Sequence, residues 1–128
     1  MIVNTGMEWI FGLLGGSPAP SGYPQGYPSI QYIAVGGSPN AIMPDQIKLT
    51  NERARALVTQ LYQATGVVVA EATFDYDQAN FIWQEVGLFA GGTASADTGI
   101  LVARGLVSED KDDRRTALII YQIGLTRG

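Results

Sequence analysis

Apolar residues recur along this chain in short runs that are separated by turns rich in Gly, Asp and Ser. Within residues 67–74 the apolar side chains alternate, a pattern typical of a half-buried β-strand. Residues 81–89 and 99–107 are two apolar runs around a loop of small and polar residues, which predicts a β-hairpin with a long connection. Residues 116–125 are apolar on both faces, so we expect a central strand buried on both sides. Strands at this spacing predict a mainly β fold, a small antiparallel β-sandwich.

The beginning of the chain follows a different pattern. Residues 1–14 predict a short helix with one apolar stripe, capped by Asn4 or Thr5. A helix this short is unstable alone, so it must pack on its own domain or on a neighbouring subunit. Residues 15–29 hold four of the six prolines, which predicts an extended arm rich in Pro, Gly and Tyr. The β-sandwich domain then covers residues 30–128.

The two apolar runs of the predicted hairpin hold one carboxylate and one guanidinium, those of Glu85 and Arg104. If Phe89 pairs with Ile100, antiparallel register places these two charges opposite each other. A slip of one residue would turn both charges to the wrong face, so the pair would fix the register. We therefore predict a structural ion pair. Removing one partner of such a pair costs about 3–5 kcal/mol when it is buried and about 0–1 kcal/mol when it is exposed.

The strands around this hairpin also carry a resemblance to a known family. The motifs EVGLF (85–89) and LVAR (101–104), with YIAVGGSPNA (32–41), VVVAEATF (67–74) and TALIIYQIGL (116–125), resemble a small tail-fibre or tail-associated domain that recurs in bacteriophages. The resemblance covers most of the chain from about residue 30 onward. The proline-rich arm is longer than its counterpart in that family.

The resemblance implies a virion structural part rather than an enzyme. The chain would be a tail-fibre, tail-tip or baseplate component, or an adaptor that attaches a fibre. It would form a homo-oligomer, contact other virion proteins of the tail or neck, and be made in the host cytoplasm before it enters the virion. The alternatives are a neck, collar or head-decoration protein and, in a different class, a module that binds host-surface glycans.

Residues 51–63 are ambiguous. Their local pattern predicts a helix, because Ala54, Leu57 and Leu61 share one helical face. The resemblance implies instead a short helical turn at residues 49–53 and a strand at residues 56–63. We expect the strand, since residues 67–74 need an antiparallel neighbour.

Composition narrows the classes of partner. Hydrophobic residues make up 46% of the chain and charged residues only 16%, below the roughly 25% of an average soluble protein. We interpret this as a sign of permanent subunit contacts, although a well-packed β-rich monomer fits as well. The net charge of −4 argues against nucleic acid, because phosphate binding needs clustered Lys and Arg. No apolar run approaches the ~20 residues of a membrane span.

Candidate chemistry is sparse. Cysteine and histidine are absent, which excludes disulfides, thiolate nucleophiles and metal sites built on thiolate or imidazole. We therefore predict no catalytic, cofactor or metal site. The candidate interface residues are Trp9, Tyr23, Tyr27 and Trp83, because exposed Trp and Tyr anchor subunit contacts or stack on sugars. For Trp83 we favour packing in the core or at an interface, whereas Tyr23 and Tyr27 either reach a neighbouring subunit or lie in a solvent-exposed loop.

Overall fold

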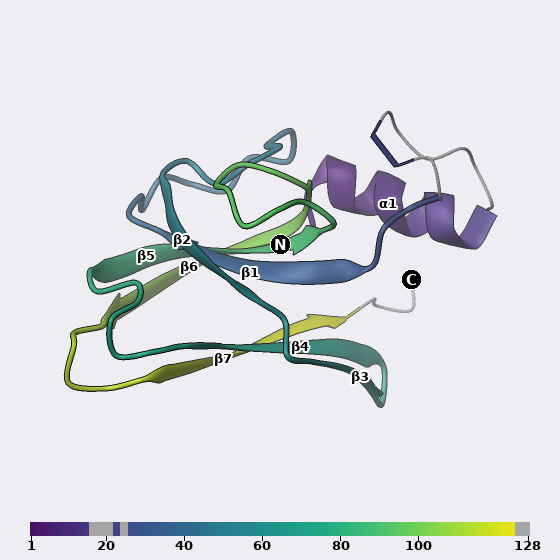
Figure 1. The fold of residues 1–128 in the computed structure, drawn as a ribbon. Coiled ribbons are helices and arrows are strands. Elements are labelled where there is room, and N and C mark those ends of the chain that lie inside the picture. The colour runs from purple at the N-terminus through teal and green to yellow at the C-terminus, as the bar shows by residue number, and fades with distance from the viewer. Residues whose placement is uncertain (16–21, 24–25, 125–128) are drawn as a thin grey trace.

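A computed structural model describes residues 1–15, 22–23 and 26–124 of the chain (Figure 1). Residues 16–21 and 24–25, which belong to the predicted arm, and residues 125–128 lie outside this part. The elements in chain order are the helix α1 (Asn4–Gly15) and the strands β1 (Ile30–Gly36), β2 (Glu52–Leu57), β3 (Gln60–Ala64), β4 (Val67–Phe74), β5 (Ile82–Ala90), β6 (Ile100–Asp110) and β7 (Ala117–Gly124).

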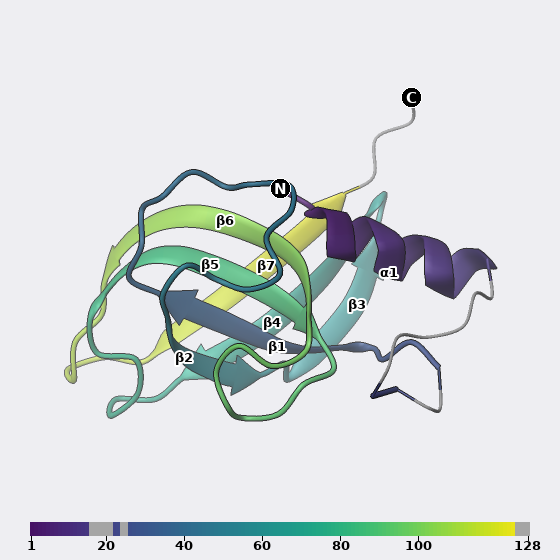
Figure 2. The same ribbon diagram turned by 90° about the horizontal axis from the view of Figure 1, so that it is seen from above.

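The strands form two antiparallel sheets that face each other. Sheet A has the order β2-β1-β5-β6, and sheet B has the order β3-β4-β7. Figure 1 shows the two sheets as separate layers with α1 beside the upper one, and Figure 2 shows the strands of sheet A lying over those of sheet B. The predicted mainly β fold, a small antiparallel sandwich with a short N-terminal helix, is confirmed.

The main hydrophobic core lies between the two sheets. Sheet B contributes the alternate residues of β4, and of these Ala70, Ala72 and Phe74 are buried. Phe74 meets Trp83 of β5 edge-to-face, with ring centroids 5.4 Å apart and an interplanar angle of 61°. This arrangement is a favourable one for an aromatic pair. The contact joins the two sheets at the end of β4.

A second apolar cluster lies on the other face of sheet A. There Tyr32 of β1 and Phe89 of β5 pack with Leu49, which belongs to the segment of residues 37–51 between β1 and β2. We call residues 37–51 the covering segment. Because of it, the centre of sheet A is buried on both faces, and β1 and β5 are almost entirely buried, whereas β2 and the second half of β6 are not.

The helix α1 packs on its own domain, against β6. A side chain at Gly6 would overlap the backbone carbonyl of Val102, so only glycine allows this close approach. The helix begins differently from the prediction. The first backbone hydrogen bond runs from Met7 to the Val3 carbonyl at 3.0 Å, and the Thr5 hydroxyl does not cap the helix but donates to the Leu101 carbonyl at 2.6 Å.

The ambiguous residues 51–63 are strand and not helix. β2 belongs to sheet A and β3 to sheet B, so the chain passes from one sheet to the other at residues 58–59. The predicted helical turn at residues 49–53 is wrong, since β2 already begins at Glu52. The β3–β4 hairpin turns at Thr65 and Gly66, and Gly66 has the positive φ of 76° that favours glycine there.

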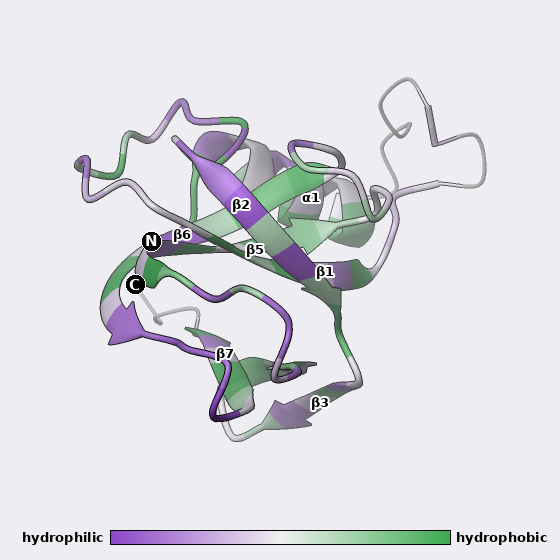
Figure 3. Ribbon diagram, turned by 60° about the vertical axis from the view of Figure 1, so that its left-hand side comes forward, coloured by the Kyte–Doolittle hydropathy of each residue, from purple (hydrophilic) through white to green (hydrophobic). Residues whose placement is uncertain are grey.

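The prediction of a central strand for residues 116–125 is wrong. Among the described strands β7 is an edge strand, because it pairs there only with β4 of sheet B. One of its faces turns toward the core, but Leu118 and Ile120 on the other face are exposed by 59% and 52%. The apolar residues on both faces of β7 predicted that both faces would be covered, and only the inner face is covered. Hydropathy along the ribbon shows this apolar strand in the lower layer (Figure 3).

Candidate functional site

The two charged residues of the β5–β6 hairpin form an ion pair with no exposure to solvent. Arg104 Nε donates to Glu85 Oε1 at 2.9 Å, and both side chains are 0% exposed. The pair lies on the face of sheet A that the covering segment occupies, since both residues also contact that segment. Charges buried this completely are tolerated only when their remaining hydrogen-bonding capacity is used.

The Glu85 carboxylate uses that capacity on the covering segment. Its Oε1 accepts the backbone N–H of Thr50 at 2.9 Å, and its Oε2 accepts those of Ser38 and Asn51 at 3.1 and 2.8 Å. These three backbone donors belong to both ends of the segment. One carboxylate thus ties the beginning and the end of the covering segment to the centre of sheet A.

The Arg104 guanidinium holds the same segment from the other side. Its Nη1 donates to the Asn40 carbonyl at 2.8 Å and lies 3.4 Å from Gln46 Oε1, while Nη2 donates to the Ser38 carbonyl at 3.3 Å. The backbone of Arg104 also exchanges two hydrogen bonds with Met1, at 2.9 and 3.0 Å. The pair is therefore the centre of a network that joins the hairpin, the covering segment and the N-terminus.

The predicted register of the hairpin is wrong, although the two side chains do meet. Phe89 pairs with Leu101 and not with Ile100, and Arg104 lies opposite Gly87. The β5–β6 ladder contains two irregularities, one between Trp83 and Glu85 and one between Leu88 and Phe89, and they change which residues lie opposite each other. Glu85 and Arg104 are consequently diagonal neighbours on one face, a distance that long side chains bridge.

A second buried Glu–Arg pair was missed at the sequence level. Arg55 of β2 makes two hydrogen bonds to Glu52, at 2.7 and 2.8 Å, with side-chain exposures of 2% and 1%. The guanidinium also lies 4.6 Å from the ring centre of Phe89 and donates to the carbonyls of Thr93 and Thr98, both at 3.0 Å. This pair fastens the long β5–β6 loop to the edge of sheet A.

The candidate interface tryptophans are buried inside the chain. Trp83 is 4% exposed and donates from its indole N–H to the Ala79 carbonyl at 2.9 Å. Trp9 is 9% exposed and donates to the Pro28 carbonyl at 2.7 Å. Neither ring is presented as an interface anchor or as a platform for a sugar, so these two candidates are corrected to core residues. For Trp83 the sequence favours packing in the core or at an interface, and the ring lies in the core.

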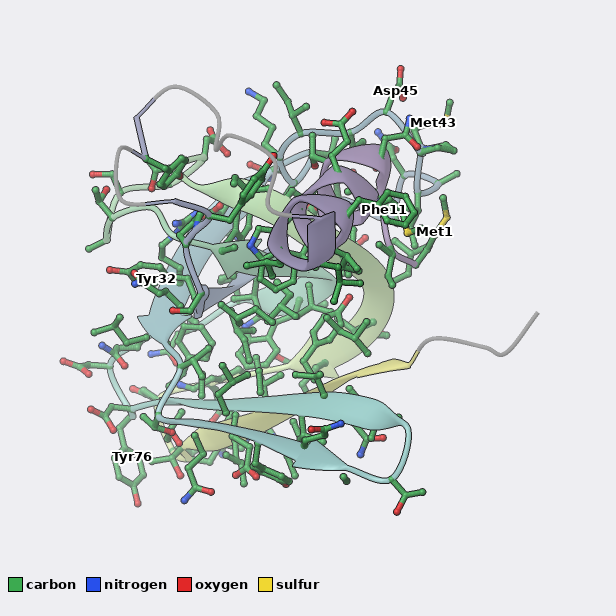
Figure 4. All side chains as sticks on the ribbon, turned by 90° about the vertical axis from the view of Figure 1, so that its right-hand side faces the viewer. Met1, Phe11, Tyr32, Met43, Asp45 and Tyr76 are labelled. Atoms are coloured by element: carbon green, nitrogen blue, oxygen red, sulfur yellow. The ribbon has the colours of Figure 1, made fainter. Side chains whose placement is uncertain are left out.

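The two tyrosines of the predicted arm are half-buried against their own chain. Tyr27 packs on α1, where its ring occupies the space that a side chain at Gly12 would need, and Tyr23 lies beside Gly91. Figure 4 shows the dense packing of side chains between helix and sheets, with Phe11 of α1 pointing away from it. Contacts of this arm with a neighbouring subunit stay a prediction.

On the inner face of β7, burial raises the pKa of the Tyr121 hydroxyl to about 12. An unfolded tyrosine ionises near pH 10. The unfolded state therefore loses this proton first, and we expect stability to fall as the pH rises from about 10 to about 12. In Tyr121→Phe, the slope of stability against pH should be smaller in that window, as measured by urea unfolding at several pH values. Equal slopes in both proteins would contradict this.

Comparison with known proteins adds no family. No family model matches the chain, and no curated protein matches its sequence. The part of the chain that the structure describes contains no helix able to cross a membrane. Across residues 1–15, 22–23 and 26–124 no acidic cluster is arranged to hold a metal ion. The resemblance to phage tail domains thus depends on the sequence motifs alone.

Proposed function

We propose that this chain is a bacteriophage virion structural protein that assembles as a homo-oligomer. Its place would be in a tail fibre, tail tip or baseplate, or in an adaptor that attaches a fibre, in contact with other virion proteins. Such a protein is made in the host cytoplasm and works in the virion. Its function is to present rigid surfaces to copies of itself and to its neighbours.

The observation that carries this proposal is the difference between the outer faces of the two sheets. The centre of sheet A, at β1 and β5, is covered by the covering segment, which the buried pair Glu85–Arg104 holds in place, while Leu57 and Leu106 at its edges are exposed. Sheet B has no such cover within the described residues: Leu118 and Ile120 of β7 and Tyr62 of β3 are 59%, 52% and 44% exposed. Apolar side chains gathered on one face of a sheet are a usual mark of a contact with another protein.

The motifs that carry the resemblance support the same proposal. EVGLF lies in β5 and LVAR lies in β6, so the two motifs are adjacent strands of sheet A. The charged residue of each motif contributes one half of the buried ion pair. A network that fixes loops to a sheet is consistent with a rigid building block.

Labelling of intact particles tests the proposal. An antibody against the chain, applied to particles purified from a lysate that contains the protein, should bind the particles at the tail and should appear at one fixed place. Binding only at the head or the neck would replace the tail assignment with a decoration or collar role. Absence of the chain from purified particles, with the protein present in the lysate, would contradict the virion assignment altogether.

A further inference from the structure

The edge strand β7 has an unusual sequence for its position. All eight of its residues lack charge, and none is proline. Edge strands expose unpaired backbone N–H and C=O groups, and natural proteins block them with charges, prolines or bulges. β7 has none of these, and its pairing with β4 runs without a register shift over its whole length.

The other edges of the sandwich differ from β7. The edge strand β2 carries Glu52, Arg53 and Arg55. The first half of β6 is paired with the N-terminus through an isolated bridge between Ile2 and Ala103. The strand β3 is uncharged but has only five residues. β7 is thus the one long, uncharged edge among the described strands.

β7 is apolar on both of its faces although one face has no cover among the described residues. Its apolar residues occupy both faces, as they do in strands that are buried on both faces, yet Leu118 and Ile120 are exposed. A groove of about 690 Å³ runs beside the strand, between β7 and β6, with Trp83, Val86 and Val107 in its wall. A further strand beside β7 would pair its free backbone N–H and C=O groups and would place its own side chains next to Leu118 and Ile120 along the outer face.

We infer that β7 pairs with β7 of a second copy of this chain, in antiparallel orientation about a two-fold axis, which makes one six-stranded sheet from two copies of sheet B. This inference deepens the proposed homo-oligomer and rests on it. Self-pairing brings every residue of the strand near the same residues of its copy, so any charge near the axis would meet its like. The absence of charge on β7 is what such an arrangement requires.

The two-fold axis falls near Ile120. In antiparallel pairs, opposed side chains lie on the same face, so the axis must pass through a residue position rather than between two. The middle of Ala117–Gly124 is Ile120 or Tyr121. In either case the side chain of Ile120 lies next to that of its own counterpart, or diagonal to it. Pairing of β7 with β3 of another copy would instead be parallel and so slightly less stable.

Two opposite charges at position 120 test the inference. The Ile120→Lys and Ile120→Glu variants should each fold, because this side chain is 52% exposed. At low salt, each variant alone should dimerise at least about 100-fold more weakly than the unchanged chain, since like charges face each other in an interface. An equimolar mixture should recover the dimer, as measured by sedimentation equilibrium.

The matched control is Ile47→Lys, which alters a side chain that is 65% exposed in the covering segment and should leave dimerisation unchanged. An unchanged chain that forms oligomers insensitive to both Ile120 variants would overturn the β7 pairing and leave the proposed homo-oligomer standing. If both charged variants dimerise more weakly and their equimolar mixture does not recover the dimer, the two-fold arrangement of β7 is wrong. A monomer at every concentration would overturn both the pairing and the homo-oligomer, whereas particle labelling decides the virion role separately.

Discussion

Arg104→Ala is expected to lower the free energy of unfolding by about 3–5 kcal/mol, because it leaves the carboxylate of Glu85 buried without its cation. The substitution also removes the donors to the Asn40 and Ser38 carbonyls of the covering segment. Urea unfolding followed by circular dichroism measures the loss as a shift of the midpoint. The control is Arg114→Ala, which breaks an ion pair whose side chains are 86% and 39% exposed and should leave the unfolding midpoint almost unchanged.

The double variant Glu85→Leu/Arg104→Met separates the ion pair from its network. Replacing a buried pair with apolar residues is often neutral. Here it should remain destabilising, because the backbone N–H groups of Ser38, Thr50 and Asn51 lose their acceptor. If Arg104→Ala unfolds at the same midpoint as the unchanged chain, the pair has no structural role. If the double variant is as stable as the unchanged chain, the carboxylate is not what holds the covering segment.

Phe74→Ala should also cost about 3–5 kcal/mol, since a large core side chain is lost and a cavity remains. Phe74 is 1% exposed and makes the edge-to-face contact with Trp83 that joins sheet B to sheet A. The same urea assay measures the effect. Val68→Ala is the matched control, because Val68 points to the same side of β4 but is 39% exposed. Similar costs for the two substitutions would contradict this account of the core.

Much of the fold could be predicted from local patterns. The alternation in residues 67–74 gave β4 correctly, and the two runs around the small, polar loop gave the β5–β6 hairpin. These predictions succeed because side chains of a half-buried strand alternate between core and solvent. The position of β7 could not be predicted in this way. Apolar residues on both faces predict that both faces will be covered, but they do not specify whether the cover comes from the same chain.

The candidate site was predicted in part. Glu85 and Arg104 were recognisable because they are isolated charges in apolar strands. The register of the hairpin could not be predicted, because the β5–β6 ladder contains irregularities that leave no local pattern in the sequence. The groups that Glu85 binds on the covering segment are backbone N–H groups, which every residue except proline has. Glu52 and Arg55 were missed because residues three apart point to opposite faces of a regular strand, whereas the β1–β2 pairing shifts register beside Glu52.

The mass of the unchanged chain in solution tests the central claim most directly, namely that this protein works by assembling with itself. Light scattering over a wide range of concentrations should give the mass of two chains, or of a larger even number of chains, at the higher concentrations. A mass that stays at that of one chain throughout the range would contradict the account.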